Sequence, residues 1–270
     1  MEVKLVELAK QRLQENRPDV LVKKQIHRKS APQHQSGMIC SGEQTVLFWH
    51  VAPSDLKTVR RILSCLKHAR PAVLTLVQTA AERIFQVDEK AIPVKDFQFE
   101  STGDIYFSYT EKLGFKHRLY IVGGGHCALA LSELMSKMDF HLCLLDDRPD
   151  LNTLHKNKFV HQKHLVDTYD TVGQYIPSGP DVYVVVMTLG YRSDAVVVRQ
   201  LLSKNVRYLG LLGSAAKVAT LLETLRSEQY PPEKIDQISA PIGLAIHSQT
   251  PEEIAVSIAA ELILRKNGTL

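Results

Sequence analysis

The stretch LYIVGGGHCALALSELMSKMDFHLCLLDDRP, from Leu119 to Pro149, places a glycine triplet between an apolar run and a helical pattern. The run LYIV predicts a strand that is buried on both faces, and a helix is expected from about Ala128 to Lys137. A second apolar run, HLCLL, follows and leads into two aspartates. Strand, tight turn, helix and strand in this order predict a βαβ unit of a parallel sheet.

The glycine triplet fits the small-residue pattern of a dinucleotide-binding turn. Gly123, Gly125 and Ala128 occupy the three small positions of G-x-G-x-x-A. In this pattern the first glycine permits a tight turn, the second lets a pyrophosphate approach the backbone, and the third residue lets the helix lie close to the sheet. The amide groups at the start of that helix attract anionic phosphate. We therefore predict a cofactor-binding turn formed by Gly123, Gly124, Gly125, His126 and Ala128. The alternative is a tight turn with a structural role only.

Two aspartates end the next strand, about 20 residues after the turn, where a ribose-binding acid is expected. Asp146 would favour a free ribose diol, whereas Arg148 could meet a 2′-phosphate, so the type of nucleotide stays open. Asp147 is a second candidate for the cofactor site, with a role in the turn before Pro149 as the alternative.

Further apolar runs, VYVVVMT and YLGLLG, continue the strand–helix alternation from His117 onward. Loops at the carboxyl ends of parallel strands bind ligands in open α/β sheets. The cofactor-binding candidates in these loops are Thr188, Gly190, Gly213, Ser214 and Lys217. Ser214 is also expected to cap a helix. For both loops, capping and turn chemistry alone is the alternative interpretation.

The change of pattern near Lys116 predicts two domains, residues 1–116 and residues 117–270. The N-terminal part contains helical patterns, including one from Asp55 to His68, and short strand patterns. Its second helix is expected to turn five apolar side chains inward: Leu56, Val59, Ile62, Leu63 and Leu66.

The composition is that of a globular protein, with 270 residues, 44% hydrophobic residues and a formal charge of +4. The basic residues form no tract that would follow a phosphate backbone, so we expect no nucleic-acid partner. No apolar run reaches the roughly 18 residues of a membrane span, and we expect no membrane partner and a cytoplasmic location. The four cysteines lack the spacing of a zinc site or a disulfide framework.

Six segments spread over most of the chain carry a resemblance to one family: GMICSGEQTV from Gly37, YIVGGGHCALAL from Tyr120, LLDDRP from Leu144, MTLGYRSD from Met187, YLGLLGSAAK from Tyr208 and APIGLAIHSQTPEEIAVSIAAELI from Ala240. Together they resemble the xanthine dehydrogenase accessory proteins of the XdhC/CoxI type. The last segment is the most specific, because a capped helix alone does not require the proline and glycine of PIGL before it.

The resemblance implies a chaperone without catalytic activity of its own. Such a protein would bind the molybdenum cofactor, as molybdopterin or its dinucleotide form, and assist its insertion into a molybdenum hydroxylase such as xanthine dehydrogenase. The implied fold is a small N-terminal α/β domain followed by a Rossmann-like domain, and the implied assembly is a homodimer. Cys40 matches a cysteine–glycine turn of the family, and its thiolate would suit molybdenum or sulfur. A small buried hydrophobe is the alternative for Cys40.

The chain departs from the family pattern in three places. Leu189 and Tyr191 stand where the family loop typically has histidines, and Ala215 and Ala216 stand where it often has arginines. Lys217 would therefore meet a phosphate alone. Family members usually carry a further N-terminal stretch before a Met-Glu pair, so the first segment of the N-terminal domain is expected to be lacking.

A second hypothesis uses the same glycine turn for an NAD(P)-dependent oxidoreductase, and a third is a nucleotide-sensing module without chemistry. The Rossmann fold hosts all of these functions. A dehydrogenase needs a proton donor or acceptor near the substrate carbon. Only Tyr191 and Lys217 are candidates for that role, which favours the chaperone.

Overall fold

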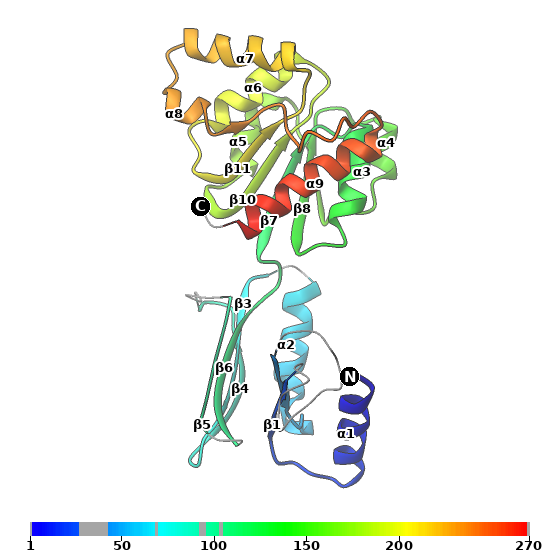
Figure 1. The fold of residues 1–270 in the computed structure, drawn as a ribbon, viewed down its shortest axis with the longest axis vertical. Helices are drawn as coiled ribbons and strands as arrows, with labels where there is room; N and C mark the ends of the chain where they lie inside the picture. Colours follow the sequence, from blue (N-terminus) through cyan, green and yellow to red (C-terminus); the bar gives the residue numbers. More distant parts are fainter. Residues whose placement is uncertain (1, 27–42, 68–69, 92–95, 103–104, 269–270) are drawn as a thin grey trace. The chain divides into compact units, whose positions relative to one another are not determined.

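The computed structural model describes residues 2–26, 43–67, 70–91, 96–102 and 105–268. The chain divides into two compact units, Met1–Gly114 and Phe115–Leu270, and the division falls two residues before the boundary that we expected from the sequence. Figure 1 shows the helices and strands of each unit. The predicted α/β class, with a parallel-sheet unit after a smaller α/β unit, is confirmed.

The described part of the second unit is built on a six-stranded sheet in which all paired strands run parallel. Its strands are β7 (His117–Val122), β8 (Phe140–Asp146), β9 (Gln162–Leu165), β10 (Gly179–Val186), β11 (Val206–Leu211) and β12 (Ile238–Ser239). Their spatial order is β12-β11-β10-β7-β8-β9. If the strands are numbered along the chain from β7 and read across the sheet from the β9 edge, the order is 3-2-1-4-5-6, as in dinucleotide-binding domains.

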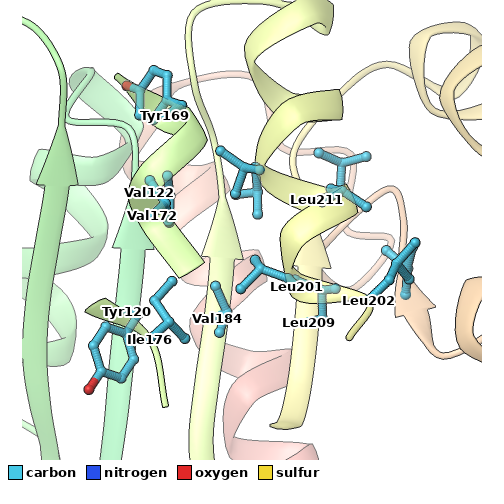
Figure 2. Close-up of a cluster of buried hydrophobic side chains, with 14 of the residues drawn as sticks. Tyr120, Val122, Tyr169, Val172, Ile176, Val184, Leu201, Leu202, Leu209 and Leu211 are labelled. Atoms are coloured by element: carbon cyan, nitrogen blue, oxygen red, sulfur yellow. The ribbon is translucent and has the colours of Figure 1, made fainter. Parts of the chain in front are cut away.

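Helices cover both faces of this sheet. They are α3 (His126–Met135), α4 (Asn152–Lys156), α5 (Val172–Tyr175), α6 (Tyr191–Leu201), α7 (Ala215–Ser227), α8 (Pro232–Ile235) and α9 (Pro251–Asn267), with a 3₁₀ turn at Tyr169–Thr171. Because side chains alternate along a strand, Leu119 and Ile121 of β7 pack with α3 and α9. Tyr120 and Val122 pack on the other face, where Figure 2 shows Val172 and Leu201 beside the strands. A fully buried aliphatic side chain contributes roughly 1.5–3 kcal/mol, so these two layers hold the sheet in place.

The first unit has an antiparallel sheet of four strands within the described residues, in the order β4-β3-β6-β5. These strands are β3 (Ala72–Gln78), β4 (Arg83–Asp88), β5 (Phe97–Thr102) and β6 (Tyr106–Leu113). The other elements are α1 (Glu2–Gln14), the antiparallel pair β1 (Leu21–Ile26) and β2 (Glu43–Phe48), a 3₁₀ turn at Pro53–Asp55, and α2 (Leu56–Lys67). Leu74 of β3 lies in both core clusters of this unit, one with α2 and one with the β1–β2 pair.

The orientation that we expected for α2 is partly wrong. Ile62 packs against the sheet together with fully buried Cys65, but Leu56, Leu63 and Leu66 are 49%, 60% and 47% exposed. Apolar residues cover more of this helix than one sheet can bury, and the buried stripe follows Val59, Ile62 and Cys65 at helical spacing.

Candidate functional site

The loops at the carboxyl edge of the parallel sheet are held next to one another by backbone hydrogen bonds. The Gly123 amide donates to the Leu145 carbonyl, and the Met187 amide donates to the Val122 carbonyl, each at 2.8 Å. The strand order reverses between β7 and β10, and open parallel sheets bind ligands at such a point. The loops that follow β7 and β10 therefore border the candidate site.

The glycine turn has the geometry that its spacing predicts. Gly123 adopts φ +105°, and a Cβ at this position would lie 2.3 Å from the Met187 carbonyl oxygen. Gly125 is the N-cap of α3, and a Cβ there would meet no protein atom within 4 Å. Ala128, in the first turn of α3, is fully buried. The turn thus closes tightly on the neighbouring loop at Gly123 and is open at Gly125, where a phosphate would approach.

The amide and the carbonyl of Gly124 are held by hydrogen bonds with side chains of β8 and α4. Its amide donates to Oδ2 of Asp146 at 2.5 Å, and its carbonyl accepts from the Thr153 hydroxyl at 2.6 Å. Both partners are buried, Asp146 completely. The backbone of the turn is therefore held in place by contacts within the protein.

The Asp146 carboxylate is surrounded by donors. Oδ1 accepts from the Arg148 amide at 2.9 Å and from Arg148 Nε at 2.8 Å. Oδ2 accepts from Arg148 Nη2 at 2.6 Å in addition to the Gly124 amide. Burial alone would raise the pKa of Asp146, but the hydrogen bonds from Arg148 and Gly124 outweigh it and lower the pKa. Asp146 is therefore a stable carboxylate at neutral pH.

Asp147 lies beside this pair and is less enclosed. Its side chain is 33% exposed, and its Oδ1 lies 3.9 Å from Arg148 Nε. Tyr169 is buried close by, and burial together with the carboxylates of Asp146 and Asp147 raises the pKa of its hydroxyl. The edge of the site next to β8 thus carries two carboxylates, one guanidinium and a neutral phenol.

A second buried carboxylate holds the loop after β10. Oδ1 of Asp194 accepts from the Thr188 amide at 3.0 Å and from the Thr188 hydroxyl at 2.5 Å. Its Oδ2 forms an ion pair with Nζ of Lys217. The Asp194 side chain is completely buried, whereas the Lys217 side chain is 26% exposed. The ammonium that we expected to meet a phosphate is therefore paired inside the protein.

The remaining sequence candidates lie at helix starts along the same edge. Gly190 is the N-cap of α6 and has open space above its Cα. Ser214 caps α7 as predicted, because its hydroxyl accepts from the Lys217 amide. Gly213 packs against the Lys217 side chain, and His126 is exposed in the first turn of α3. Contacts link Gly123, Gly124, Asp146, Thr188 and Lys217 into one network. Gly190 joins it through its carbonyl, which accepts from the Thr188 hydroxyl at 3.3 Å. His126 has no contact with this network within the described residues.

The metal-binding candidate Cys40 lies outside the described residues. Within the residues that are described, no group of three or more His, Cys, Asp or Glu side chains is arranged to hold a metal ion. Burial raises the pKa of the Cys127 thiol, and it raises that of Cys143 to about 11. These two thiols are therefore protonated near neutral pH, in agreement with packing roles.

The side chains that the oxidoreductase hypothesis requires are engaged elsewhere. The Tyr191 hydroxyl is 2.8 Å from the Thr224 hydroxyl and ties α6 to α7, and Lys217 is paired with Asp194. Sequence reasoning missed Asp194 as the centre of this network. The only signal was an acid in the first turn of a helix that follows a strand, and such an acid commonly does no more than interact with the helix dipole.

The strand order, the glycine turn and the acid that ends β8 define a protein with a Rossmann-type unit. Residues 119–262, more than half of the chain, match the family described as the XdhC Rossmann domain. The chain belongs to this family.

Three similar proteins extend this finding. The chain is 27% identical over 248 residues to a probable xanthine dehydrogenase subunit of Bacillus subtilis, covering 84% of this chain and 70% of that protein. It is 28% identical over 157 residues to YqeB of Escherichia coli, covering 57% of this chain but only 28% of that protein. A crystal structure of a xanthine dehydrogenase from Bacillus halodurans has the same fold, with a TM-score of 0.71, 24% identity, and coverage of 98% of this chain and 80% of that one.

Across the described residues, no helix combines the length and the apolar character that crossing a bilayer demands.

Proposed function

We propose that this protein binds the molybdenum cofactor at the carboxyl edge of its second unit and assists cofactor insertion into a molybdenum hydroxylase such as xanthine dehydrogenase. The observation that carries the proposal is the open glycine turn at Gly125 in a chain of the XdhC family. The B. subtilis relative, which matches 84% of this chain, bears the name of a xanthine dehydrogenase subunit. In this accessory role, the protein would bind the cofactor, and the partner enzyme would carry out the reaction.

The residues of the turn fit a phosphate-bearing ligand. An added Cβ at Gly125 would occupy space that no protein atom fills, so a phosphate can reach the first amides of α3 there. Those amides belong to Gly125, His126 and Cys127, and the ten residues of α3 add a helix dipole. When bound, the cofactor supplies the molybdenum centre that the partner enzyme uses. Cys40 remains the proposed soft ligand of the first unit.

An NAD(P)-dependent oxidoreductase is the weaker proposal. It shares the glycine turn, but Tyr191 and Lys217, its candidates for proton transfer, have partners within the protein. No observation in the structure favours it over the accessory role.

Gly125→Val tests the proposal. The parent, purified from cells that make the cofactor, should carry a fluorescent pterin and molybdenum, measured after release by mass spectrometry and metal analysis. The variant should remain folded, because a Cβ at Gly125 meets no protein atom within 4 Å, yet should retain roughly tenfold less cofactor because the side chain blocks the phosphate.

Gly125→Ala serves as the graded control, since its single methyl group should reduce retention less. The parent should also activate a cofactor-free molybdenum hydroxylase, and Gly125→Val should do so poorly. A folded Gly125→Val protein with the parent's cofactor content would show that the turn has only a structural role. A parent protein that contains no pterin would contradict the proposal. A homodimer is part of the proposal and is measured by light scattering on the same preparations.

A further inference from the structure

A cavity of about 740 Å³ lies at the amino edge of the parallel sheet, opposite the edge that carries the glycine turn (Figure 1). The first residues of β10, β11 and β12 line it, together with residues at the ends of α6, α8 and α9. Small-molecule sites in proteins commonly have volumes of roughly 300–1,000 Å³. The cavity therefore has the size of a ligand site, and none of its lining residues belongs to the proposed cofactor site.

The charged side chains that line this cavity are mostly cations. They are four basic residues and one acid: Lys204, Arg207, Lys234, Arg265 and Asp236. The acid is 70% exposed, and its Oδ1 lies 3.7 Å from Nη2 of Arg226. Nη2 of Arg265 lies 3.8 Å from Oε1 of buried Glu261. The charges of Asp236 and Arg265 are thus compensated by residues outside the lining.

The other three cations have no counter-ion within the part of the chain that the structure describes. Lys204, Arg207 and Lys234 are each half-buried and form no ion pair with a described residue. Nη2 of Arg207 donates to the Arg265 carbonyl at 3.3 Å, and this neutral partner leaves the guanidinium charge uncompensated. A concave site with low-dielectric walls concentrates the field of such charges on its interior. The cavity therefore attracts an anion.

Helix ends account for only part of this cluster. Cations are favourable near the carboxyl end of a helix, and Lys204 follows α6 while Lys234 lies in the last turn of α8. However, α8 has four residues and therefore a small dipole, and Arg207 belongs to strand β11. The convergence of all three on one cavity is better explained by a ligand.

The rest of the lining indicates the kind of anion. Leu202, Leu209 and Ile238 contribute apolar surface to the same cavity. A phosphate monoester carries about 1.5–2 negative charges near pH 7, which matches three cations better than a single carboxylate does. We propose that the cavity binds a small organic phosphate, with Lys204, Arg207 and Lys234 around the phosphate and the apolar side chains against its organic part. This second site is independent of the proposed cofactor function.

Calorimetric titration of the full chain with phenyl phosphate and with benzoate tests the inference, because both probes carry a phenyl ring but differ in charge. The parent should bind phenyl phosphate roughly tenfold more tightly than benzoate. The double variant Lys204→Gln, Lys234→Gln should bind phenyl phosphate roughly tenfold more weakly than the parent, and it should stay folded because neither ammonium has a partner to lose. The matched control is Lys156→Gln, Lys158→Gln, which removes two exposed lysines outside the cavity and should leave the affinity unchanged.

Three results would overturn the inference. They are the absence of saturable phenyl phosphate binding to the parent, equal binding of the two probes, and an unchanged affinity in the folded Lys204→Gln, Lys234→Gln protein. Binding should also persist in Gly125→Val, because that residue lies at the opposite edge of the sheet. If Gly125→Val abolishes it, the phosphate binds at the glycine turn, so the second site falls while the proposed function stands. If cofactor retention fails but phenyl phosphate binds as expected, the second site stands alone.

Discussion

Gly123→Ala is expected to destabilise the second unit strongly. Gly123 has φ +105°, and the new Cβ would lie 2.3 Å from the Met187 carbonyl oxygen and 2.8 Å from the Thr188 nitrogen. Holding a residue other than glycine at such a φ costs roughly 1–3 kcal/mol, and overpacking adds about 1–3 kcal/mol. Met187 is a backbone neighbour whose amide is bonded to the Val122 carbonyl, so it cannot easily move away. We therefore expect a loss of about 3–5 kcal/mol in the free energy of unfolding.

Chemical denaturation of the full chain can assign this loss to one unit. Trp49, the single tryptophan of the sequence, lies in the first unit. The tryptophan fluorescence of the variant should therefore change at the same denaturant concentration as that of the parent. Circular dichroism at 222 nm should show that the second unit of the variant unfolds at a lower denaturant concentration than that of the parent. Gly125→Ala is the control and should cost under about 1 kcal/mol, because its Cβ meets no atom within 4 Å. A Gly123→Ala protein as stable as the parent would refute the close contact between the two loops.

Two further predictions concern buried charge. Lys217→Met should lower the free energy of unfolding by about 2–4 kcal/mol, because it leaves fully buried Asp194 without its counter-ion. A double variant that also carries Asp194→Asn should recover part of this loss. Strictly additive losses in the two single variants and the double variant would contradict the pairing. Burial, His161 and Arg118 lower the pKa of His141 from 6.5 to about 4, so the folded state keeps this imidazole neutral. Its stabilising contribution is complete above about pH 6.5 and is lost as the pH falls toward 4, by roughly 2 kcal/mol between pH 7.5 and 5. Denaturation curves of His141→Gln should show a flatter pH dependence in that window, and an unchanged dependence would mean that other groups cause it.

The parallel sheet was predictable because its signals are local. Strands such as β8 and β10 are buried on both faces, so each reads as a continuous apolar run with a turn at its end. The spacing of Gly123, Gly125 and Ala128 then located the strand–turn–helix crossing, and the structure has the tight turn, the open position and the buried alanine in those places.

The side of α2 that faces the sheet was less predictable. The apolar residues of the helix form one broad face, and periodicity alone cannot choose which part of that face meets the sheet. The choice depends on which stripe meets Leu74 and Val87 of the sheet, which is a tertiary contact. Leu63, at 60% exposure, shows that an apolar position in a helical pattern is not necessarily a core position.

The candidate site shows where motif spacing stops being informative. Spacing correctly placed an acid at the end of β8, but two aspartates are adjacent there, and the ribose-binding motif describes only position along the chain. Which carboxylate can accept a hydrogen bond depends on Arg148, whose guanidinium folds back onto Asp146 rather than onto Asp147. That choice follows from burial, because a fully buried carboxylate needs compensation that an exposed one obtains from water. The same reasoning applies to Asp194, which is fully buried and pairs with the ammonium of Lys217, 23 residues further along the chain. The charge of Lys217 is therefore compensated within the protein. In this protein, therefore, Asp146 and Lys217, two charged groups that look available in the sequence, are used by the fold to hold its loops.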